Sequence, residues 1–300
     1  MDRKLNARRG AAAAERAEEL GLSAEREWID WFSVQRNVVI ELPGGPEIVY
    51  VIAHYDKVDV NPLVFVSTLL NGVLDPLIGW TYTSDGAVDN ATGVAVVLQA
   101  AYELSKLEDR RYTYRFLLAG SEESGLRGTR AHVAKLSAEE KERIVLALNV
   151  DTVGLATTDN CVMSDVSSDS MTRLALQLAA EGGVPMGAGT IPPGASSDHA
   201  VFAKNSAGRD IGRSAMFNLT GALLPQRSYF TTRSETEVLF FSSCLEFDGL
   251  DLLGGCLLLP TGKLHGFRDQ AEQVDPMRLW HTYAVVNSVL MYGEVHGLPL

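Results

Sequence analysis

Apolar residues occur along the chain in two kinds of run, and these alternate. Short runs rich in β-branched and aromatic residues predict strands, and longer stretches with helical spacing predict helices. The predicted strands cover residues 37–42, 47–53, 112–119, 144–151 and 214–219. The predicted helices cover residues 11–32 (one or two amphipathic helices), 90–107, 124–136, 167–182 and 276–292. This alternation indicates an α/β protein whose mostly parallel sheet is covered on both faces.

Two long segments interrupt the alternation. Residues 57–86 are too many for an ordinary connection between a strand and a helix, and residues 182–197 are rich in Gly, Pro and Ser. Connections of that length usually form lids or binding loops. Residues 43–46 read Pro-Gly-Gly-Pro and predict a tight turn between the first two strands. Residues 1–300 contain no repeat or linker that would divide the chain, so we expect one domain.

Ionisable side chains gather where the predicted strands end and the following helices begin. They are His54, Asp56, Asp89, Glu122, Glu123 and Asp151. The carboxyl ends of parallel strands share one edge of an open α/β sheet, where ligands bind. Carboxylates brought together there would repel one another and raise one another's pKa values. A divalent metal ion removes that repulsion, and imidazole and carboxylate ligands without thiolate suit zinc, manganese or cobalt.

Net charge and hydropathy indicate which binding partners and which cellular location to expect for the protein. The chain has 38 acidic and 26 basic residues, a net charge of -12, which disfavours binding to nucleic acid or to anionic lipid. The apolar segment 62–80 is interrupted by polar and turn-forming residues, so we expect no membrane span. The first residues lack the apolar stretch of a secretory leader, and we therefore expect a cytoplasmic protein.

The cysteines are few and widely spaced. They are Cys161, Cys244 and Cys256, without the close pairs that structural zinc sites use. We interpret them as free buried thiols in a reducing compartment, with an oxidising compartment as the alternative.

Six segments together resemble a known family. They read VIAHYD, GAVDNATG, LLAGSEESGLRGTRAH, NVDTVG, SSDHAVF and LHGFRDQAEQVD, in that order. In order and content they are similar to the zinc-dependent aminopeptidases of the M28 type, and the resemblance spans residues 36–292. It implies a three-layer α/β/α sandwich with a mixed, mostly parallel central sheet. It also implies that the chain is a single zinc-peptidase catalytic domain.

The resemblance further implies a centre of two divalent metal ions, with Zn²⁺ the expected metal. Asp89 would bridge both ions. Glu123 and His265 would complete the ligands of one ion. His54 and Asp151 would complete the ligands of the other. His199 is the alternative to His265, and otherwise Asp198 and His199 would shape the pocket.

The same resemblance assigns two catalytic roles. Glu122 would be the general base that takes a proton from a metal-activated water and passes it to the leaving amine. Asp56 would accept the second N–H of the His54 ring and fix its tautomer. The implied reaction is hydrolysis of the N-terminal peptide bond of a peptide substrate.

Other functions are compatible with the same fold. A glutaminyl cyclase would use one zinc ion and need Asp89, Glu123 and His265, but not His54 and Asp151. A non-catalytic binding module would have lost ligands, and all five are present here. A carboxypeptidase or an amidohydrolase remains an alternative, because the pocket decides the substrate. The apolar insertion at residues 57–86 could form a lid over the substrate or an interface with a second copy of the chain.

Overall fold

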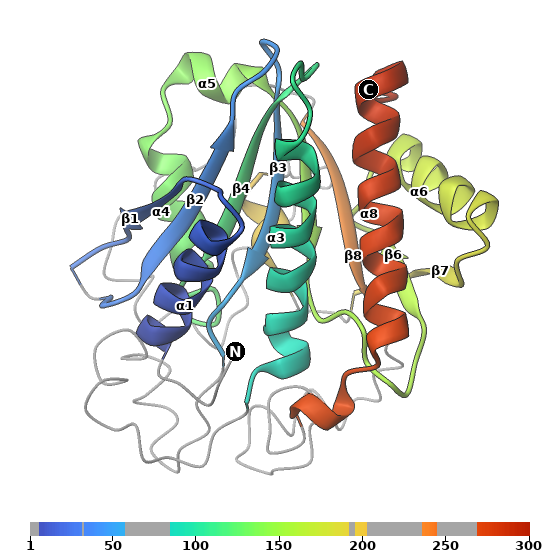
Figure 1. Cartoon of the computed structure of the whole chain (residues 1–300), viewed down its shortest axis with the longest axis horizontal. Coiled ribbons are helices and arrows are strands. Elements are labelled where there is room, and N and C mark those ends of the chain that lie inside the picture. The colour runs from blue at the N-terminus through green and yellow to red at the C-terminus, as the bar shows by residue number, and fades with distance from the viewer. Residues whose placement is uncertain (1–5, 32, 58–84, 192–195, 203–235, 245–268) are drawn as a thin grey trace.

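The computed structural model describes residues 6–31, 33–57, 85–191, 196–202, 236–244 and 269–300. Eight strands form its centre. They are β1 (Ala24–Trp28), β2 (Arg36–Leu42), β3 (Ile48–His54), β4 (Thr113–Ala119), β5 (Ile144–Val150), β6 (Asn160–Met163), β7 (Met186–Gly189) and β8 (Glu237–Ser243). All eight belong to one sheet with the spatial order β1-β2-β4-β3-β5-β8-β6-β7 (Figure 1).

The sheet is mixed, and its centre is parallel. β3 pairs in parallel with both β4 and β5, and β5 pairs in parallel with β8. β6 and β7 form a further parallel pair. The antiparallel pairs are β1 with β2, β2 with β4, and β6 with β8. Because β3, β4 and β5 run in the same direction, their carboxyl ends lie together at one edge of the sheet.

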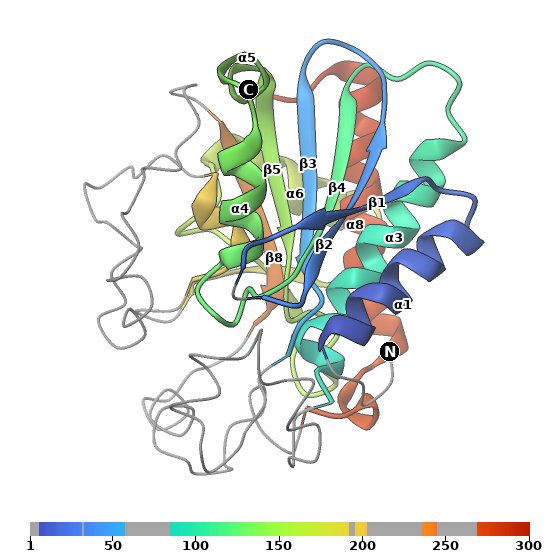
Figure 2. The same cartoon turned by 90° about the vertical axis from the view of Figure 1, so that its left-hand side faces the viewer.

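Helices cover both faces of this sheet. One layer contains α1 (Asn6–Glu19), α3 (Thr92–Ser105), α6 (Asp169–Glu181) and α8 (Pro276–His296). The other face carries α4 (Arg127–Lys135) and the short 3-10 helix η2 (Asp198–Val201), with α5 (Ala138–Arg143) following α4. Figure 2 shows α4 on one side of the strands and α1, α3 and α8 on the other. The predicted α/β/α sandwich is confirmed.

The strand β3 shows how the sequence supplies both layers. Its side chains alternate between two hydrophobic cores, as the period of a strand requires. Val49, Val51 and Ala53 pack in the core under α1, α3 and α8. Ile48, Tyr50 and Ile52 pack in the core on the opposite face, with Val133 of α4 and Phe202 after η2 among its members. A strand buried on both faces must be apolar throughout, which is why β3 and β5 were predictable.

Two local predictions are wrong, and one strand pairing differs from the order along the chain. Helix was expected through residues 11–32, but α1 ends at Glu19 and residues 24–28 form the edge strand β1. Two strands, β2 and β3, do lie on either side of the predicted turn at residues 43–46, but in the sheet β4 lies between them. Residues 182–197 were expected to be irregular, yet they include β7. An edge strand tolerates the charged residues of β1, because its outer side faces solvent.

Two predictions about secondary structure and loops lie outside the described residues. The predicted strand at residues 214–219 is one of them. The second is the predicted lid or interface, because only the borders of the 57–86 insertion are described. Among the described helices, none combines the length and the hydropathy needed to cross a bilayer.

The cysteines differ from expectation. Cys161 in β6 and Cys244 directly after β8 form a disulfide that joins positions 83 residues apart. The interpretation of these two residues as free thiols is therefore wrong. Cys256 lies outside the described residues. The cytoplasmic location predicted from the sequence thus loses the support that cysteine usage gave it.

Candidate metal centre

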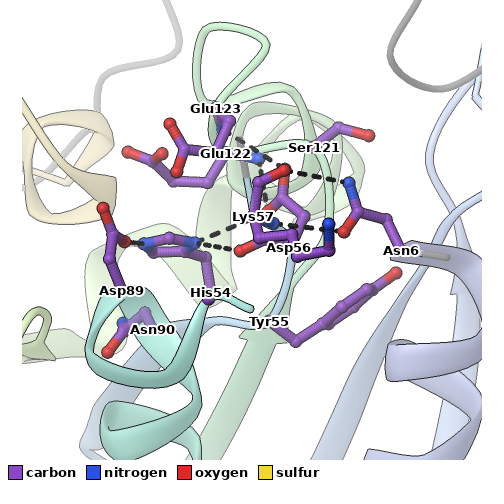
Figure 3. Close-up of polar contacts among 12 residues, drawn as sticks. Asn6, His54, Tyr55, Asp56, Lys57, Asp89, Asn90, Ser121, Glu122 and Glu123 are labelled. Atoms are coloured by element: carbon purple, nitrogen blue, oxygen red, sulfur yellow. Dashed lines mark hydrogen bonds and ion pairs between the residues drawn. The ribbon is translucent and has the colours of Figure 1, made fainter. Parts of the chain in front are cut away.

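The candidate site lies at the carboxyl ends of the three central parallel strands. His54 is the last residue of β3, and Asp151 directly follows β5. Glu122 and Glu123 follow the end of β4, and Asp89 lies in the π-helical turn η1 (Ala87–Ala91) that precedes α3. Figure 3 shows the side chains of His54, Asp89, Glu122 and Glu123 close together. The sequence therefore placed these residues correctly at one edge of the sheet.

The His54 ring has a defined orientation. Its Nε2 atom lies 3.1 Å from Asp89 Oδ1 and 3.2 Å from Asp151 Oδ1. On the other side of the ring, Nδ1 lies 3.2 Å from the backbone carbonyl oxygen of Asp56. A carbonyl oxygen only accepts, so Nδ1 carries the proton that is donated to Asp56. In the neutral ring this leaves the lone pair of Nε2 directed at the carboxylates, as metal binding requires.

Asp56 contributes in two ways. Its backbone carbonyl accepts from His54, while its carboxylate Oδ1 lies farther away, 3.6 Å from His54 Nδ1. The carboxylate accepts hydrogen bonds from the backbone N–H groups of Glu122 at 3.0 Å and Glu123 at 3.3 Å. Asp56 therefore links the end of β3 to the loop after β4. The sequence predicted a contact of Asp56 with the imidazole but not this link.

The loop that carries Asp89 is anchored from two sides. Asn90 Nδ2 donates to the carbonyl of Val150 at 2.9 Å, and Asn90 Oδ1 accepts from the backbone N–H of Thr152 at 3.2 Å. The buried Asp269 accepts from the backbone N–H of Val88 at 2.7 Å and from that of Asp89 at 3.3 Å. The roles of Asn90 and Asp269 were not predicted from the sequence, although both residues lie within the segments that carry the family resemblance.

The electrostatics of the site are dominated by its carboxylates. Burial opposes charging of the His54 ring, but neighbouring carboxylates, above all Asp151, outweigh burial and raise the pKa of His54 well above its usual value. Burial raises the pKa of Glu122 well above its usual value, and the charge of Glu123 adds to this, although His54 acts in the opposite direction. These acidic groups therefore repel one another, as the sequence predicted.

Three of these side chains could hold a metal ion. One nitrogen of His54 and one carboxylate oxygen each of Asp89 and Glu123 lie within 4.8 Å of one another. Asp151 approaches the same imidazole nitrogen as Asp89. A donor set of one nitrogen and several carboxylate oxygens fits zinc, and also manganese or cobalt. The residues present therefore fit a divalent ion.

The two remaining ligand candidates have different outcomes. His265 lies outside the described residues, so its predicted role stays a prediction. His199, the alternative, is buried in η2, and its ring stacks on Phe240 with 4.6 Å between the ring centroids. Burial lowers the pKa of His199 to about 4. Within the described residues, the metal-capable group does not include His199.

Asp198 lies beside the same site. Thr129 Oγ1 donates to Asp198 Oδ1 at 2.5 Å. Burial raises the pKa of Asp198 to about 7, although His54 and Thr129 act in the opposite direction. Asp198 and His199 were predicted to shape the pocket, and that role stays a prediction.

Comparison with known proteins gives one sequence family and one fold. A model of peptidase family M28 matches residues 37–211. Aminopeptidase YwaD of Bacillus subtilis is 34% identical over 109 residues, which are 36% of this chain and 19% of that protein. The matched segment thus spans about a fifth of that relative.

Solved structures agree in fold. The zinc aminopeptidase BSAP from Bacillus subtilis has a TM-score of 0.55 at 22% identity, over 86% of this chain and 49% of that chain. A glutaminyl cyclase from Porphyromonas gingivalis has a TM-score of 0.59 at 15% identity, over 94% of this chain and 87% of that chain. At these identities the structures support the fold alone. The family model, in contrast, matches more than half of the sequence, and the chain belongs to peptidase family M28.

Proposed function

We propose that this chain is a metal-dependent exopeptidase that hydrolyses the N-terminal peptide bond of peptides. The observation that carries the proposal is the convergence of His54, Asp89 and Glu123, whose donor atoms lie within 4.8 Å of one another. Family membership and the aminopeptidase relatives support the same activity. We further propose that residues 1–300 act as one catalytic domain.

The proposed centre holds two divalent ions, with Zn²⁺ the expected metal. Asp89 would contact both ions. Glu123 and His265 would complete one set of ligands, and His54 and Asp151 the other. The 3.1 and 3.2 Å distances from His54 Nε2 to Asp89 and Asp151 support the second set. When bound, two such ions lower the pKa of a bound water and polarise the carbonyl of the scissile bond.

Glu122 is the proposed general base. Its side chain is buried beside that of Glu123, and Asp56 fixes its backbone N–H at 3.0 Å. The carboxylate of Glu122 would take a proton from the attacking water and pass it to the nitrogen of the leaving amine. Glu123 would serve as a ligand, so the two adjacent glutamates divide the tasks.

One rival function has an observation in its favour. The glutaminyl cyclase of Porphyromonas gingivalis matches this chain over 94% of its length with a TM-score of 0.59. A cyclase with one zinc ion would not need the second ligand pair. This chain has both His54 and Asp151, and His54 Nε2 lies 3.1 Å from Asp89 Oδ1 and 3.2 Å from Asp151 Oδ1. We therefore favour the peptidase with two metal ions.

A panel of chromogenic substrates tests this proposal. Purified protein with added Zn²⁺ is assayed on aminoacyl p-nitroanilides and on the same compounds with an acetylated amino group. We expect hydrolysis of the free-amine series only, loss of activity with chelator, and recovery with Zn²⁺. Hydrolysis of the acetylated series at an equal rate would contradict an aminopeptidase. Cyclisation of glutaminyl peptides with binding of one ion at most would assign the cyclase instead.

A further inference from the structure

Arg9 is a charged side chain buried in the interior of the described structure. It lies in α1, and none of its surface is exposed. Arginine is almost never fully buried unless its guanidinium is paired. The hydrogen-bond partners of the guanidinium therefore show which parts of the chain α1 holds in place.

The guanidinium of Arg9 joins two separate segments of the chain. Its Nε donates to the backbone carbonyl of Tyr55 at 2.5 Å. Its Nη1 and Nη2 donate to the carbonyls of Asp85 at 2.7 Å and Gly86 at 2.9 Å. Tyr55 directly follows His54, and Gly86 precedes Asp89 by three residues. One planar group thus connects the segments that carry two of the candidate metal ligands.

Asn6 reinforces this connection one turn earlier in α1. Residues three apart on a helix share a face, so Asn6 and Arg9 reach the same region. Asn6 Nδ2 donates to the carbonyl of Lys57 at 3.2 Å, and Asn6 Oδ1 accepts from the backbone N–H of Lys57 at 3.1 Å. Figure 3 shows Asn6 beside Lys57 and Asp56, with the His54 side chain on the far side of these two residues. The Asn6 side chain therefore pairs with both the N–H and the carbonyl group of Lys57, in the loop after β3.

Gly86 shows how tightly the two segments are packed. Its φ angle is 58°, a conformation that favours glycine. A Cβ atom at this position would lie 2.6 Å from Lys57 Cβ and 2.9 Å from Arg9 Nη2. A side chain at position 86 therefore requires Lys57 or the Arg9 guanidinium to move.

We propose that Arg9, assisted by Asn6, is a positioning residue of the metal centre. By holding both segments it maintains the 3.1 Å approach of His54 Nε2 to Asp89 Oδ1. Lysine cannot replace it, because a single ammonium group lacks the planar fork that reaches three carbonyl oxygens in different directions. The N-terminal helix is then a functional part of the centre. This inference rests on the proposed function, since it assumes that His54 and Asp89 bind metal.

The first test compares Arg9→Lys with Arg8→Lys, because Arg8 lies on the exposed face of the same helix. Each metal-stripped variant is checked for folding by circular dichroism, and its Zn²⁺ affinity is measured by competition with a chelator. We expect Arg9→Lys to weaken Zn²⁺ binding by about 10–100-fold, the usual range for residues that support a ligand. The absorption spectrum of bound Co²⁺ should change as well. Arg8→Lys should match the unmodified protein in both measurements.

A folded Arg9→Lys protein with unchanged Zn²⁺ affinity and an unchanged Co²⁺ spectrum would overturn the inference. Should Arg9→Lys not fold, Gly86→Ala provides the test, with Gly183→Ala as its control. Gly183 has a similar φ of 66°, but nothing lies within 4 Å of the added Cβ. We expect Gly86→Ala alone to weaken Zn²⁺ binding by about 10-fold or more. Equal affinities in these two glycine variants would overturn the inference.

The same measurements separate this inference from the proposed function. An unmodified protein that binds no Zn²⁺ would contradict the proposed function, and the inference with it. An unmodified protein that binds Zn²⁺ as tightly as Arg9→Lys does would contradict the positioning role alone.

Discussion

Among the described residues, His54 and His132 both form a buried contact with a carboxylate, and of these two only His54 belongs to the candidate metal centre. His54 at the end of β3 lies close to Asp89 and Asp151. His132 in α4 lies between two partners: Nδ1 is 2.8 Å from Glu27 Oε2, and Nε2 is 2.9 Å from the hydroxyl of Tyr50. Both rings are nearly inaccessible to solvent. Burial next to a carboxylate therefore does not distinguish the two.

The balance of charge does distinguish them. Glu27 also contacts Lys135 Nζ at 3.1 Å. Burial raises the pKa of Glu27, but His132 and Lys135 outweigh it and lower that pKa to about 2. Around His54 the carboxylates outnumber the imidazole, and the pKa of Glu122 rises instead. A buried acidic cluster that its own chain leaves poorly neutralised is what a divalent ion stabilises, whereas the His132 cluster needs no ion.

Glu122→Gln should have the largest effect. Glutamine keeps the shape of the side chain but cannot accept a proton. We expect kcat to fall by about 10²–10⁴-fold while both metal ions stay bound and KM changes little. Steady-state kinetics and elemental analysis of the purified variant check this.

Glu123→Gln is the matched variant. It replaces an anionic ligand with a neutral one, so metal affinity should fall first, and added Zn²⁺ should restore part of the activity. Loss of metal from Glu122→Gln with retention by Glu123→Gln would mean that the two roles must be exchanged.

Replacing each histidine by asparagine separates the two sites directly. His54→Asn should weaken Zn²⁺ binding by about 100-fold or more, at or beyond the upper end of the range for a residue that only supports a ligand. His132→Asn should leave Zn²⁺ binding unchanged and lower the free energy of unfolding by about 2–3 kcal/mol, because Glu27 and Tyr50 lose a buried partner. Zn²⁺ titration and urea unfolding of the metal-stripped variants measure both quantities. Equal changes in Zn²⁺ affinity and in the free energy of unfolding for the two variants would contradict the distinction between the two sites.

Acid should weaken the His132 cluster through Glu27. The pKa of Glu27 is about 2 in the folded protein against an ordinary 4.5. A lowered pKa contributes stability that is complete above pH 4.5 and is lost as the pH falls toward 2. The contribution is at most about 3 kcal/mol, since one pKa unit corresponds to about 1.4 kcal/mol.

In Glu27→Gln the free energy of unfolding should therefore decrease less between pH 4.5 and pH 2 than it does in the unmodified protein. Urea unfolding at several pH values, with the exposed Glu25→Gln on the same strand as control, measures the difference. Equal slopes for the two variants would show that the Glu27–His132 pair adds no pH-dependent stability.

The smallest effect is expected from Tyr50→Phe. The Tyr50 hydroxyl lies 2.9 Å from His132 Nε2 and accepts from Arg115 Nη1 at 3.2 Å. Its removal should lower the free energy of unfolding by about 1–2 kcal/mol, because buried polar groups lose a partner. Metal affinity should not change. An unfolding curve that overlays that of the unmodified protein would show that the hydroxyl contributes no net stability.

The sequence could predict those parts of the fold that local pattern decides. β3 and β5 are continuous apolar runs, as strands buried on both faces must be. Because these strands are parallel, their carboxyl ends meet at one edge of the sheet, where ligands bind. Which strands lie side by side in the sheet depends on tertiary structure. The position of β4 between β2 and β3 could therefore not be predicted from the local sequence. The five residues of β1 carry three charges and read as a continuation of the helix before them.

The candidate site divides in the same way. His54, Asp89 and Glu123 could be predicted, because their segments carry the family pattern at strand ends. The residues that hold these segments could not, since their contacts depend on the path of the loops. Asp269 binds backbone 180 residues away, and Arg9 binds backbone 46 and 77 residues away. No periodicity or spacing encodes such contacts.

Titration of the metal-stripped protein with Zn²⁺ tests the central claim most directly. Isothermal calorimetry gives the number of ions bound per chain, and Asp89→Asn is measured beside the unmodified protein. If Asp89 bridges two ions at this edge of the sheet, the unmodified chain binds two ions and Asp89→Asn binds fewer than one at the same concentrations. An unmodified chain that binds no Zn²⁺, or an Asp89→Asn variant that binds it equally well, would contradict the account.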